Sequence, residues 1–310
     1  MSEYTTRPLT ASDSSAVQSM TFPAYRHMLA LEPTPRHPEQ GDRKVVQPVG
    51  QVALHGDAIV GLAFGEVPGP AGGEPELLSL LVAAPHRRSG VATALVAALE
   101  ADVAARGFSH LTAVYSTGKP DIETIERIFR VRGWTEPAVR SITVRFSIDE
   151  ALSTPWFGRA SFRNPDYQIV SWSDVGTEEK AALMQEQREQ GWIPAGLEPW
   201  RHDQLGFDTL SSVGLRFQGR LAGWVINHRV SRDTMRFTCS WMRTDLRGLA
   251  RIVPLYTESL KRLAQTGEYR HCMFITPVAY SGMVEFVRRR CEKWISFVGE
   301  TKGVQKALAS

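Results

Sequence analysis

The chain has 310 residues, and its 43% hydrophobic and 22% charged residues, with a formal net charge of +3, are ordinary values for a globular protein of about two domains. These values exclude an intrinsically disordered or fibrous chain and argue against a general nucleic-acid binder. Three cysteines without a CxxC spacing, no apolar signal-peptide core and no stretch long enough to span a membrane predict a cytoplasmic protein without a disulfide framework or a metal site.

The first half of the chain predicts a mixed α/β domain. Asp13 and Ser14 can cap a helix, and the apolar run from Leu77 to Val82 is typical of a buried central strand. Gly107 can end the long helix that follows this strand. The expected elements are a strand at 4–9, a helix from 14 to about 30, a hairpin at 51–67, a strand at 77–82, a helix at 91–107, a strand at 111–115, a helix at 121–132 and a strand at 140–148.

The second half repeats this order of elements at an offset of about 160 residues. Tyr4 corresponds to Tyr167, and Gly90 corresponds to Gly248. A near-constant offset of this kind predicts a duplicated domain. We therefore expect one domain at residues 1–150, a linker at 151–165 and a second domain at 166–310.

The strongest local signal is the loop Pro85-His86-Arg87-Arg88-Ser89-Gly90 between the strand at 77–82 and the next helix. The first N–H groups of a helix lack backbone partners and carry a partial positive charge. Gly90 and Ala92 let an anion approach the backbone closely, and Arg87 and Arg88 add charge. The pattern predicts a cradle for a pyrophosphate; the alternative is a solvated basic loop.

The segment Arg87-x-x-Gly90-x-Ala92 resembles the acyl-CoA-binding motif Arg/Gln-x-x-Gly-x-Gly/Ala of the GNAT acyltransferase superfamily. A second similarity is an aromatic residue four positions before a Gly-Trp pair, here Phe129 before Gly133-Trp134. The resemblance implies two tandem GNAT-like α/β domains, each with a mixed, splayed central sheet flanked by helices, and acyl-CoA in the splay of the first. The residues that it assigns to acyl-CoA are Leu80, Leu81, Val82, Arg87, Arg88, Ser89, Gly90, Val91, Ala92, Thr93, Lys119 and Phe129.

The resemblance also implies direct attack of a primary amine on the acyl thioester, with a backbone N–H near Leu80–Val82 stabilising the thioester oxygen. Many family members have a general-base Glu where this chain has Leu78. Glu76 lies two residues earlier on the same strand face and is our candidate base, acting directly or through water. The alternative for Glu76 is a solvated carboxylate at the start of a strand, and Glu74 is a weaker candidate.

The general acid departs from the family pattern, because Phe129 replaces the usual Tyr and a phenyl ring cannot donate a proton. Three outcomes stay open: Tyr115 or Ser116 serves instead, the CoA thiolate leaves without an acid, or the domain binds acyl-CoA without transferring the acyl group. Lys119, in the segment 115–120, is expected to contact the CoA phosphates or an acidic group of the acceptor. A plain turn before the next helix is the alternative for this segment.

The corresponding loop of the second half runs from Arg243 to Arg251. Asp245 occupies the Arg position of the motif, where an acidic side chain repels a pyrophosphate. We also expect Pro254 to disturb the following helix beyond its first turn. The second domain is therefore predicted to be a degenerate GNAT-like domain with an acceptor-binding or structural role.

Together these inferences predict an acyl-CoA-dependent N-acyltransferase that acts on a primary amine without a metal. The acyl group is acetyl or a medium- or long-chain fatty acyl group. The acceptor is expected to be a Lys or ornithine side chain of a ribosomal peptide, as in the fatty-acyl-transferring GNAT maturases of natural product biosynthesis. The alternatives are an acetyltransferase of a small amine metabolite or antibiotic and a non-catalytic acyl-CoA-binding module. The sequence sets neither the acceptor nor the oligomeric state.

Overall fold

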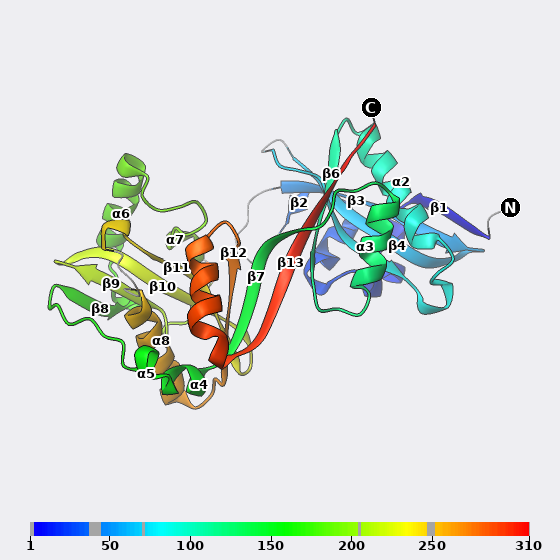
Figure 1. Ribbon diagram of the computed structural model, residues 1–310. Helices are drawn as coiled ribbons and strands as arrows, with labels where there is room; N and C mark the ends of the chain where they lie inside the picture. Colours follow the sequence, from blue (N-terminus) through cyan, green and yellow to red (C-terminus); the bar gives the residue numbers. More distant parts are fainter. Residues whose placement is uncertain (1–2, 37–44, 70–71, 204–205, 247–251, 310) are drawn as a thin grey trace. The chain divides into compact units, whose positions relative to one another are not determined.

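The computed structural model describes residues 3–36, 45–69, 72–203, 206–246 and 252–309. It divides into two compact units: unit 1 is Met1–Arg140 with Glu300–Ser310, and unit 2 is Ser141–Gly299. Each unit has a mixed central sheet with helices packed on it (Figure 1). This confirms the predicted fold class of two α/β domains.

Unit 1 is built on a sheet with the strand order β1-β3-β4-β5-β6-β13, and β2 pairs with the outer part of β3. Its neighbours are antiparallel except for β5 and β6, which are parallel. The predicted hairpin at 51–67 is present and longer on both sides. The strands are β1 (Tyr4–Pro8), β2 (Thr34–Pro35), β3 (Val45–His55), β4 (Ala58–Pro68), β5 (Glu76–Val82), β6 (His110–Ser116) and the end of β13 (Ile295–Ala307).

The helices of unit 1 include the two predicted long ones, α2 (Val91–Ala105) and α3 (Ile122–Val131). The prediction of one helix from 14 to about 30 is wrong, because a short α1 (Ser14–Val17) is followed by 3₁₀ turns at Gln18–Met20 and Pro23–Ala30. Pro23 explains why Phe22 does not continue a helix, since a proline disfavours helical conformation in the residue before it. Phe22 is extended there, with ψ at 147°.

Hydrophobic side chains cover both faces of the unit 1 sheet, because alternate residues of a strand point to opposite faces. On one face Ala63 and Leu77 pack with α2, and on the other Leu62 and Leu78 pack with the segment 17–31. The sheet is therefore a buried central layer. Its position fixes the loop between β5 and α2 at the carboxyl end of a rigid strand.

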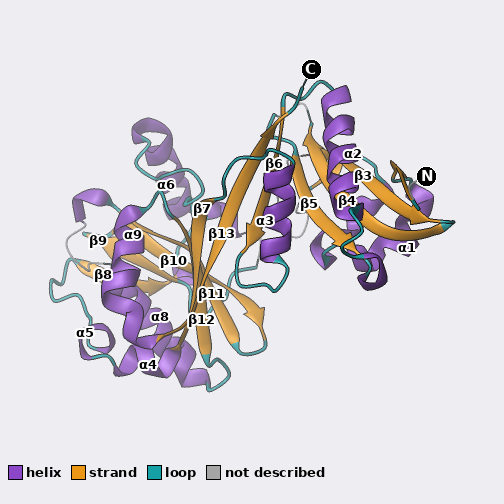
Figure 2. Ribbon diagram, turned by 45° about the vertical axis from the view of Figure 1, so that its right-hand side comes forward, coloured by secondary structure: helices purple, strands orange, loops and turns teal. Residues whose placement is uncertain are grey.

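Unit 2 repeats this plan with the strand order β8-β9-β10-β11-β12-β7 and one parallel pair, β11 with β12. α8 packs against β9 and β10 on one face, and α6 packs on the other (Figure 2). The elements are β7 (Ala138–Ser147), α4 (Ile148–Ser153), α5 (Pro155–Gly158), β8 (Tyr167–Ser171), α6 (Thr177–Gln190), α7 (Trp200–Asp203), β9 (Val213–Phe217), β10 (Arg220–Ser231), β11 (Thr234–Met242), α8 (Val253–Thr266), β12 (His271–Pro277) and α9 (Ser281–Phe286).

Each unit takes one strand from the distant half of the sequence. Residues Thr301–Ala307 of β13 pair with β6 in unit 1, whereas Ser141–Ser147 of β7 pair with β12 in unit 2 (Figure 1). The compact units therefore differ from the predicted ranges 1–150 and 166–310. The predicted linker 151–165 is packed into unit 2, where Phe157 is buried and its carbonyl oxygen accepts a hydrogen bond from Thr257 Oγ1 at 2.8 Å.

A β-bulge marks equivalent positions in the two sheets. In unit 1 Leu78 is the extra residue of β5 opposite β4, and in unit 2 Thr238 is the extra residue of β11 opposite β10. Beyond the bulges the parallel strands separate. β5 pairs with β6 only at Glu76 and Leu77, and the pairing of β11 with β12 ends at Phe237. Both sheets thus carry the expected splay, and the two bulges lie 160 residues apart in sequence.

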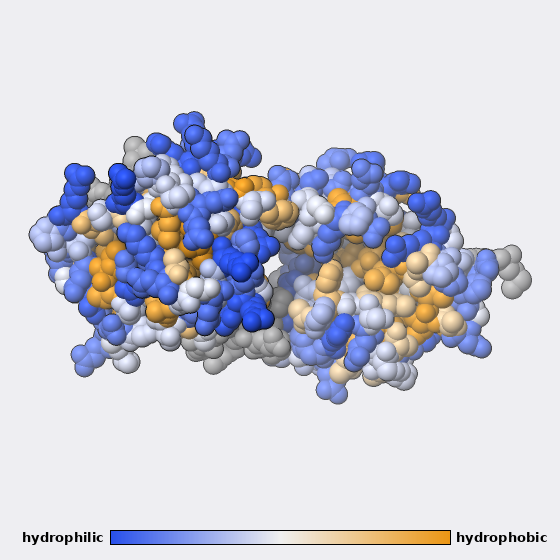
Figure 3. Space-filling view, turned by 90° about the horizontal axis from the view of Figure 1, so that it is seen from below, coloured by the Kyte–Doolittle hydropathy of each residue, from blue (hydrophilic) through white to orange (hydrophobic). Residues whose placement is uncertain are grey.

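Hydrophilic side chains cover much of the face that Figure 3 shows, with hydrophobic patches on both units. Within the described ranges, no helix is long and apolar enough to cross a membrane. The same ranges contain no group of three or more His, Cys, Asp or Glu side chains arranged to hold a metal ion.

Candidate functional site

The site predicted in unit 1 begins at the point where β5 leaves β6. Leu80, Leu81 and Val82 still pair with β4, but they have no partner on β6. Their backbone groups on the β6 side therefore face the opening of the splay. The carbonyl oxygen of Val82 accepts a hydrogen bond from Arg87 Nε at 3.0 Å, which ties the following loop back to the strand.

That loop ends in a sharp left-handed turn before α2. Gly90 is the N-cap of α2 with φ at 84°, and Arg88 has φ at 64°, a conformation that costs a non-glycine residue about 1–2 kcal/mol. The first hydrogen bond along the helix runs from Ala94 N to the Gly90 carbonyl oxygen at 3.0 Å. The N–H groups of Val91, Ala92 and Thr93 precede this bond and lack intrahelical acceptors. The turn therefore presents free donors at the positive end of a 15-residue helix.

A pocket of about 670 Å³ joins these parts. It brings together the predicted residues Leu80–Val82, Arg87, Arg88 and Gly90–Thr93 on one side. The opposite wall is α3, which sequence reasoning did not assign to the site. The further lining residues are His86, Asp121, Thr124, Ile125, Arg127 and Ile128. Three arginines in one pocket with the α2 N-terminus favour a ligand with several negative charges.

Two of the predicted residues lie in or beside the core of unit 1 instead of lining this pocket. Phe129 is 3% exposed and packs between Tyr115 and Trp134. The Tyr115 hydroxyl donates to Glu126 Oε1 at 3.0 Å, and burial together with this bond raises the pKa of Tyr115. Glu126 also accepts a hydrogen bond from Lys302 of β13, which lowers the pKa of Glu126. The phenolic proton of Tyr115 is therefore held in a hydrogen bond to the Glu126 carboxylate.

Three other predicted residues also lie outside the lining. Ser116 is exposed at the end of β6 and is opposite Thr301 in the register. Ser89 donates its hydroxyl to the His86 carbonyl oxygen at 2.6 Å, which shapes the loop. Lys119 does not line the pocket, and its Nζ lies 5.0 Å from the centre of the Phe22 ring in a cation–π contact.

The candidate base Glu76 belongs to an acidic pair, defined here as Glu66 on β4 and Glu76 on β5. The two residues are opposite each other beside the bulge. Arg36 bridges them, with Nη1 at 3.1 Å from Glu66 Oε1 and Nη2 at 3.0 Å from Glu76 Oε2. The Glu66 side chain is 4% exposed and that of Glu76 is 17% exposed. Two carboxylates against one guanidinium leave this end of the splay acidic.

Burial raises the pKa of Tyr25, which lies close enough to Arg36, Glu76 and Glu66 to interact with all three. Sequence reasoning missed Tyr25, Arg36 and Glu66. The expected hairpin at 51–67 was the one available signal, because its second strand contains Glu66 and directly precedes, in the chain, the strand that begins at Glu76.

The corresponding loop of unit 2 is described only in part. Asp245, in the Arg position of the motif, accepts two hydrogen bonds from Arg243, at 3.1 and 2.9 Å. Residues 247–251, which include Gly248, lie outside the described residues. The expectation for Pro254 is wrong, because α8 begins at Val253 and places Pro254 in the first turn, where a missing N–H costs nothing.

The fold and this pocket define a class of protein. Residues 17–129, all within unit 1, match the model of the acetyltransferase (GNAT) family. Unit 1 therefore contains a GNAT family domain, as the loop motif predicted. A search of curated proteins found no match.

Solved structures extend the similarity to the whole chain. A tandem GNAT protein from the clavulanic acid biosynthesis pathway is 14% identical, covers 99% of both chains and has a TM-score of 0.64. A GCN5-related N-acetyltransferase from Sphaerobacter thermophilus is 14% identical over 100% of this chain and 97% of that one, with a TM-score of 0.60. A glucosamine N-acetyltransferase region of a fungal β-N-acetylglucosaminidase has a TM-score of 0.61 at 14% identity, over 97% of this chain and 38% of that one. At such identities the likeness establishes a tandem GNAT fold.

Proposed function

We propose that unit 1 binds acyl-CoA and transfers the acyl group to a primary amine. One observation carries the proposal: a single pocket joins the splayed end of β5, the free amides of α2 and three arginines. The pyrophosphate would lie at the start of α2, where N–H groups and positive charge meet. The thioester would then lie along β5, whose unpaired backbone groups at Leu80–Val82 supply the donor that an oxyanion needs.

The acidic pair suits the other half of this reaction. An amine reaches the protein as an ammonium ion, and the net charge of Glu66, Glu76 and Arg36 attracts it. Glu76 is the more exposed carboxylate and is the proposed base, taking a proton from the ammonium directly or through water. The amine nitrogen then attacks the thioester carbon, the C–S bond breaks, and the CoA thiolate leaves, while the second proton of the attacking nitrogen passes to water or to the departing thiolate. Because the Tyr115 proton is held by Glu126, we propose that the thiolate leaves without a side-chain acid.

Replacing Gly90 with alanine is expected to weaken CoA binding by about 10- to 100-fold, the loss that corresponds to one or two hydrogen bonds to a charged group. An added Cβ meets no protein atom within 4 Å at this position, so it would project into open space beside the pocket lining. Titration calorimetry with CoA measures the effect.

Gly107→Ala is the matched control. Gly107 lies just beyond the other end of α2 and has φ at 88°, and a Cβ added there would also meet no atom within 4 Å. Both variants thus carry the same backbone strain, and only Gly90→Ala changes the pocket. Equal CoA affinities for the two variants would contradict the proposed cradle.

Glu76→Gln is expected to lower kcat by about 10²- to 10⁴-fold, the usual contribution of a general base, and to leave the Kd for CoA unchanged. Release of the CoA thiol in the presence of primary amines measures the rate. Glu74→Gln is the control, because Glu74 is exposed and only approaches His110 at 3.6 Å. A rate that survives Glu76→Gln but falls with Glu66→Gln would transfer the role to Glu66.

From the sequence resemblance we further propose that the donor carries a fatty acyl group and that the acceptor is a Lys or ornithine side chain of a peptide. A series of acyl-CoAs from acetyl to C16 tests the fatty-acyl proposal, and a peptide with Lys or ornithine tests the acceptor against amino sugars and other small amines.

One observation favours a second function, an acyl-CoA-binding module: no described residue of the pocket lining is a tyrosine or cysteine that could protonate the thiolate. Tight CoA binding without thiol release for any amine would support that function.

A further inference from the structure

Equivalent positions beside the two bulges carry opposite charges. In unit 1 the acidic pair Glu66 and Glu76 lies next to the bulge at Leu78. In unit 2 the same register positions, next to Thr238, hold His228 on β10 and Arg236 on β11. His202 from α7 joins them, with its ring centre 6.2 Å from that of His228. We call His202, His228 and Arg236 the basic cluster.

Among the side chains that the structure describes, which do not include that of Asp203, none forms an ion pair with Arg236. It is only partly exposed, its Nε is buried without a hydrogen-bond partner, and burial lowers its pKa. Burial also lowers the pKa of both histidines. Asp208 interacts with His228, but its carboxylate accepts hydrogen bonds from the N–H and the hydroxyl of Ser211. Buried arginines are normally paired, so a cluster whose described side chains give Arg236 no acidic partner is suited to an anionic ligand.

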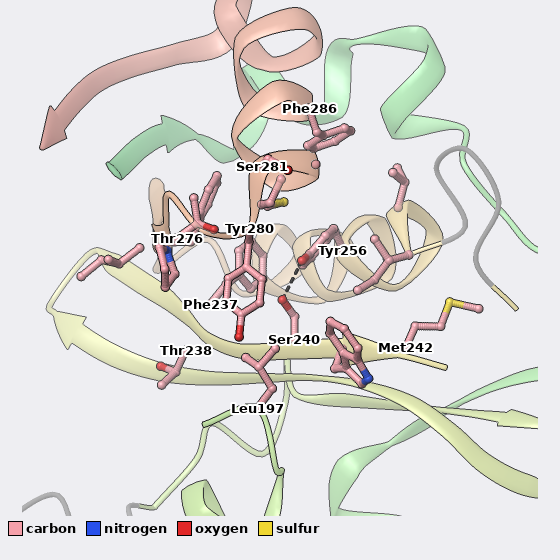
Figure 4. A pocket seen from close by; sticks show the side chains of 18 of the residues that line it. Leu197, Phe237, Thr238, Ser240, Met242, Tyr256, Thr276, Tyr280, Ser281 and Phe286 are labelled. Carbon is pink, nitrogen blue, oxygen red and sulfur yellow. Dashed lines mark hydrogen bonds between the residues drawn. The ribbon is translucent and has the colours of Figure 1, made fainter. Parts of the chain in front are cut away.

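An apolar pocket of about 610 Å³ opens beside this cluster, between β11, β12, α8 and α9. It occupies the splay of unit 2, yet its described lining contains no charged side chain, in contrast to the three arginines of the unit 1 pocket. Phe237 and Met242 of β11 and Phe286 of α9 are among its lining residues, which Figure 4 labels. Its polar features are few; Ser240 Oγ and the Tyr256 hydroxyl lie 2.6 Å apart on one wall.

Thr238 connects the pocket to the basic cluster. It lines the pocket, and its Oγ1 lies 2.9 Å from His228 Nδ1. A ligand that fills the apolar space and reaches Thr238 therefore comes close to His228, and Arg236 is directly opposite His228 in the strand register. Apolar walls select an apolar body, and an arginine selects a negatively charged end.

We propose that unit 2 binds an apolar carboxylic acid, with its hydrocarbon part in this pocket and its carboxylate at the Thr238 end beside the basic cluster. This role goes beyond the transfer reaction proposed for unit 1 and does not depend on it. It gives a function to a domain whose acidic Asp245 speaks against binding CoA. The splay of unit 1 would then accept an ammonium group, and the equivalent splay of unit 2 would accept a carboxylate.

The test compares three probes of equal chain length on the full chain: decanoate, decanol and decylamine, each titrated by calorimetry. We expect decanoate to bind at least about tenfold more tightly than decanol, a difference of about 1.4 kcal/mol, and decylamine to bind most weakly. Equal affinities for all three probes, or no binding of decanoate, would overturn the proposal.

Variants locate the site. Arg236→Met should reduce decanoate to the affinity of decanol while decanol still binds, whereas a merely structural role of Arg236 would weaken both probes. Arg220→Met is the control, since this arginine of β10 is 76% exposed. Met283→Trp, which fills the pocket, should abolish binding of both probes. A decanoate preference that survives Arg236→Met, or binding that survives Met283→Trp, would overturn the assignment.

Discussion

A chain that ends at Gly299 is expected to lose the folded sheet of unit 1 and, with it, CoA binding. The reason is the splay. β6 pairs with β5 at only two positions, Glu76 with Thr112 and Leu77 with Ala113, but it pairs with β13 at seven, from Thr301–Ser116 to Ala307–His110. Removing residues 300–310 therefore leaves β6 with few backbone partners. It also removes Val304 from the core beneath α2 and α3, at a cost of several kcal/mol.

Hydrogen exchange of the β6 amides measures this effect directly, since protection there reports the pairing with β13. The control is a chain that ends at Leu308, which keeps all seven pairs and the bond from Leu308 N to the Ser109 carbonyl oxygen. Unchanged protection of β6 in the chain that ends at Gly299 would show that β13 is dispensable for unit 1.

The sequence was most informative where consecutive residues form the candidate site. The residues from Arg87 to Thr93 could be singled out because a strand, a glycine turn and a helix N-terminus follow each other directly, and all of them except Ser89 line one pocket. The second wall of the pocket was missed, although Asp121, Thr124 and Ile128 share one face of α3 by helical spacing. An amphipathic helix alone gives no indication of whether its polar face meets solvent or a ligand.

Contacts between distant segments were beyond sequence reasoning. The strand after α3 was expected to complete the first domain, but it pairs with β12, and the last strand of the chain takes its place beside β6. Strand propensity is the same in either sheet, so no local pattern distinguishes these pairings. The Arg36 bridge has the same origin, because it lies in a proline-rich loop and reaches carboxylates 30 and 40 residues away.

Arg36→Met is expected to lower the free energy of unfolding of unit 1 by about 3–5 kcal/mol, the usual effect of removing one partner of a buried ion pair. Glu66 is nearly inaccessible to water, with 4% of its side chain exposed, and without Arg36 its charge loses the bond at 3.1 Å that compensates for burial. Glu76 on the opposite strand adds repulsion once the bridging cation is absent. Urea unfolding followed by circular dichroism measures the loss.

Two further variants separate this mechanism from a general loss of packing. Arg36→Met combined with Glu66→Gln should recover a large part of the stability, because the neutral amide removes the uncompensated charge while keeping the shape of the side chain. Arg7→Met breaks a bidentate pair with Asp13 in which the arginine is 40% exposed, and it should cost no more than about 1 kcal/mol. If Glu66→Gln does not rescue Arg36→Met, the bridge stabilises unit 1 through packing and not through charge.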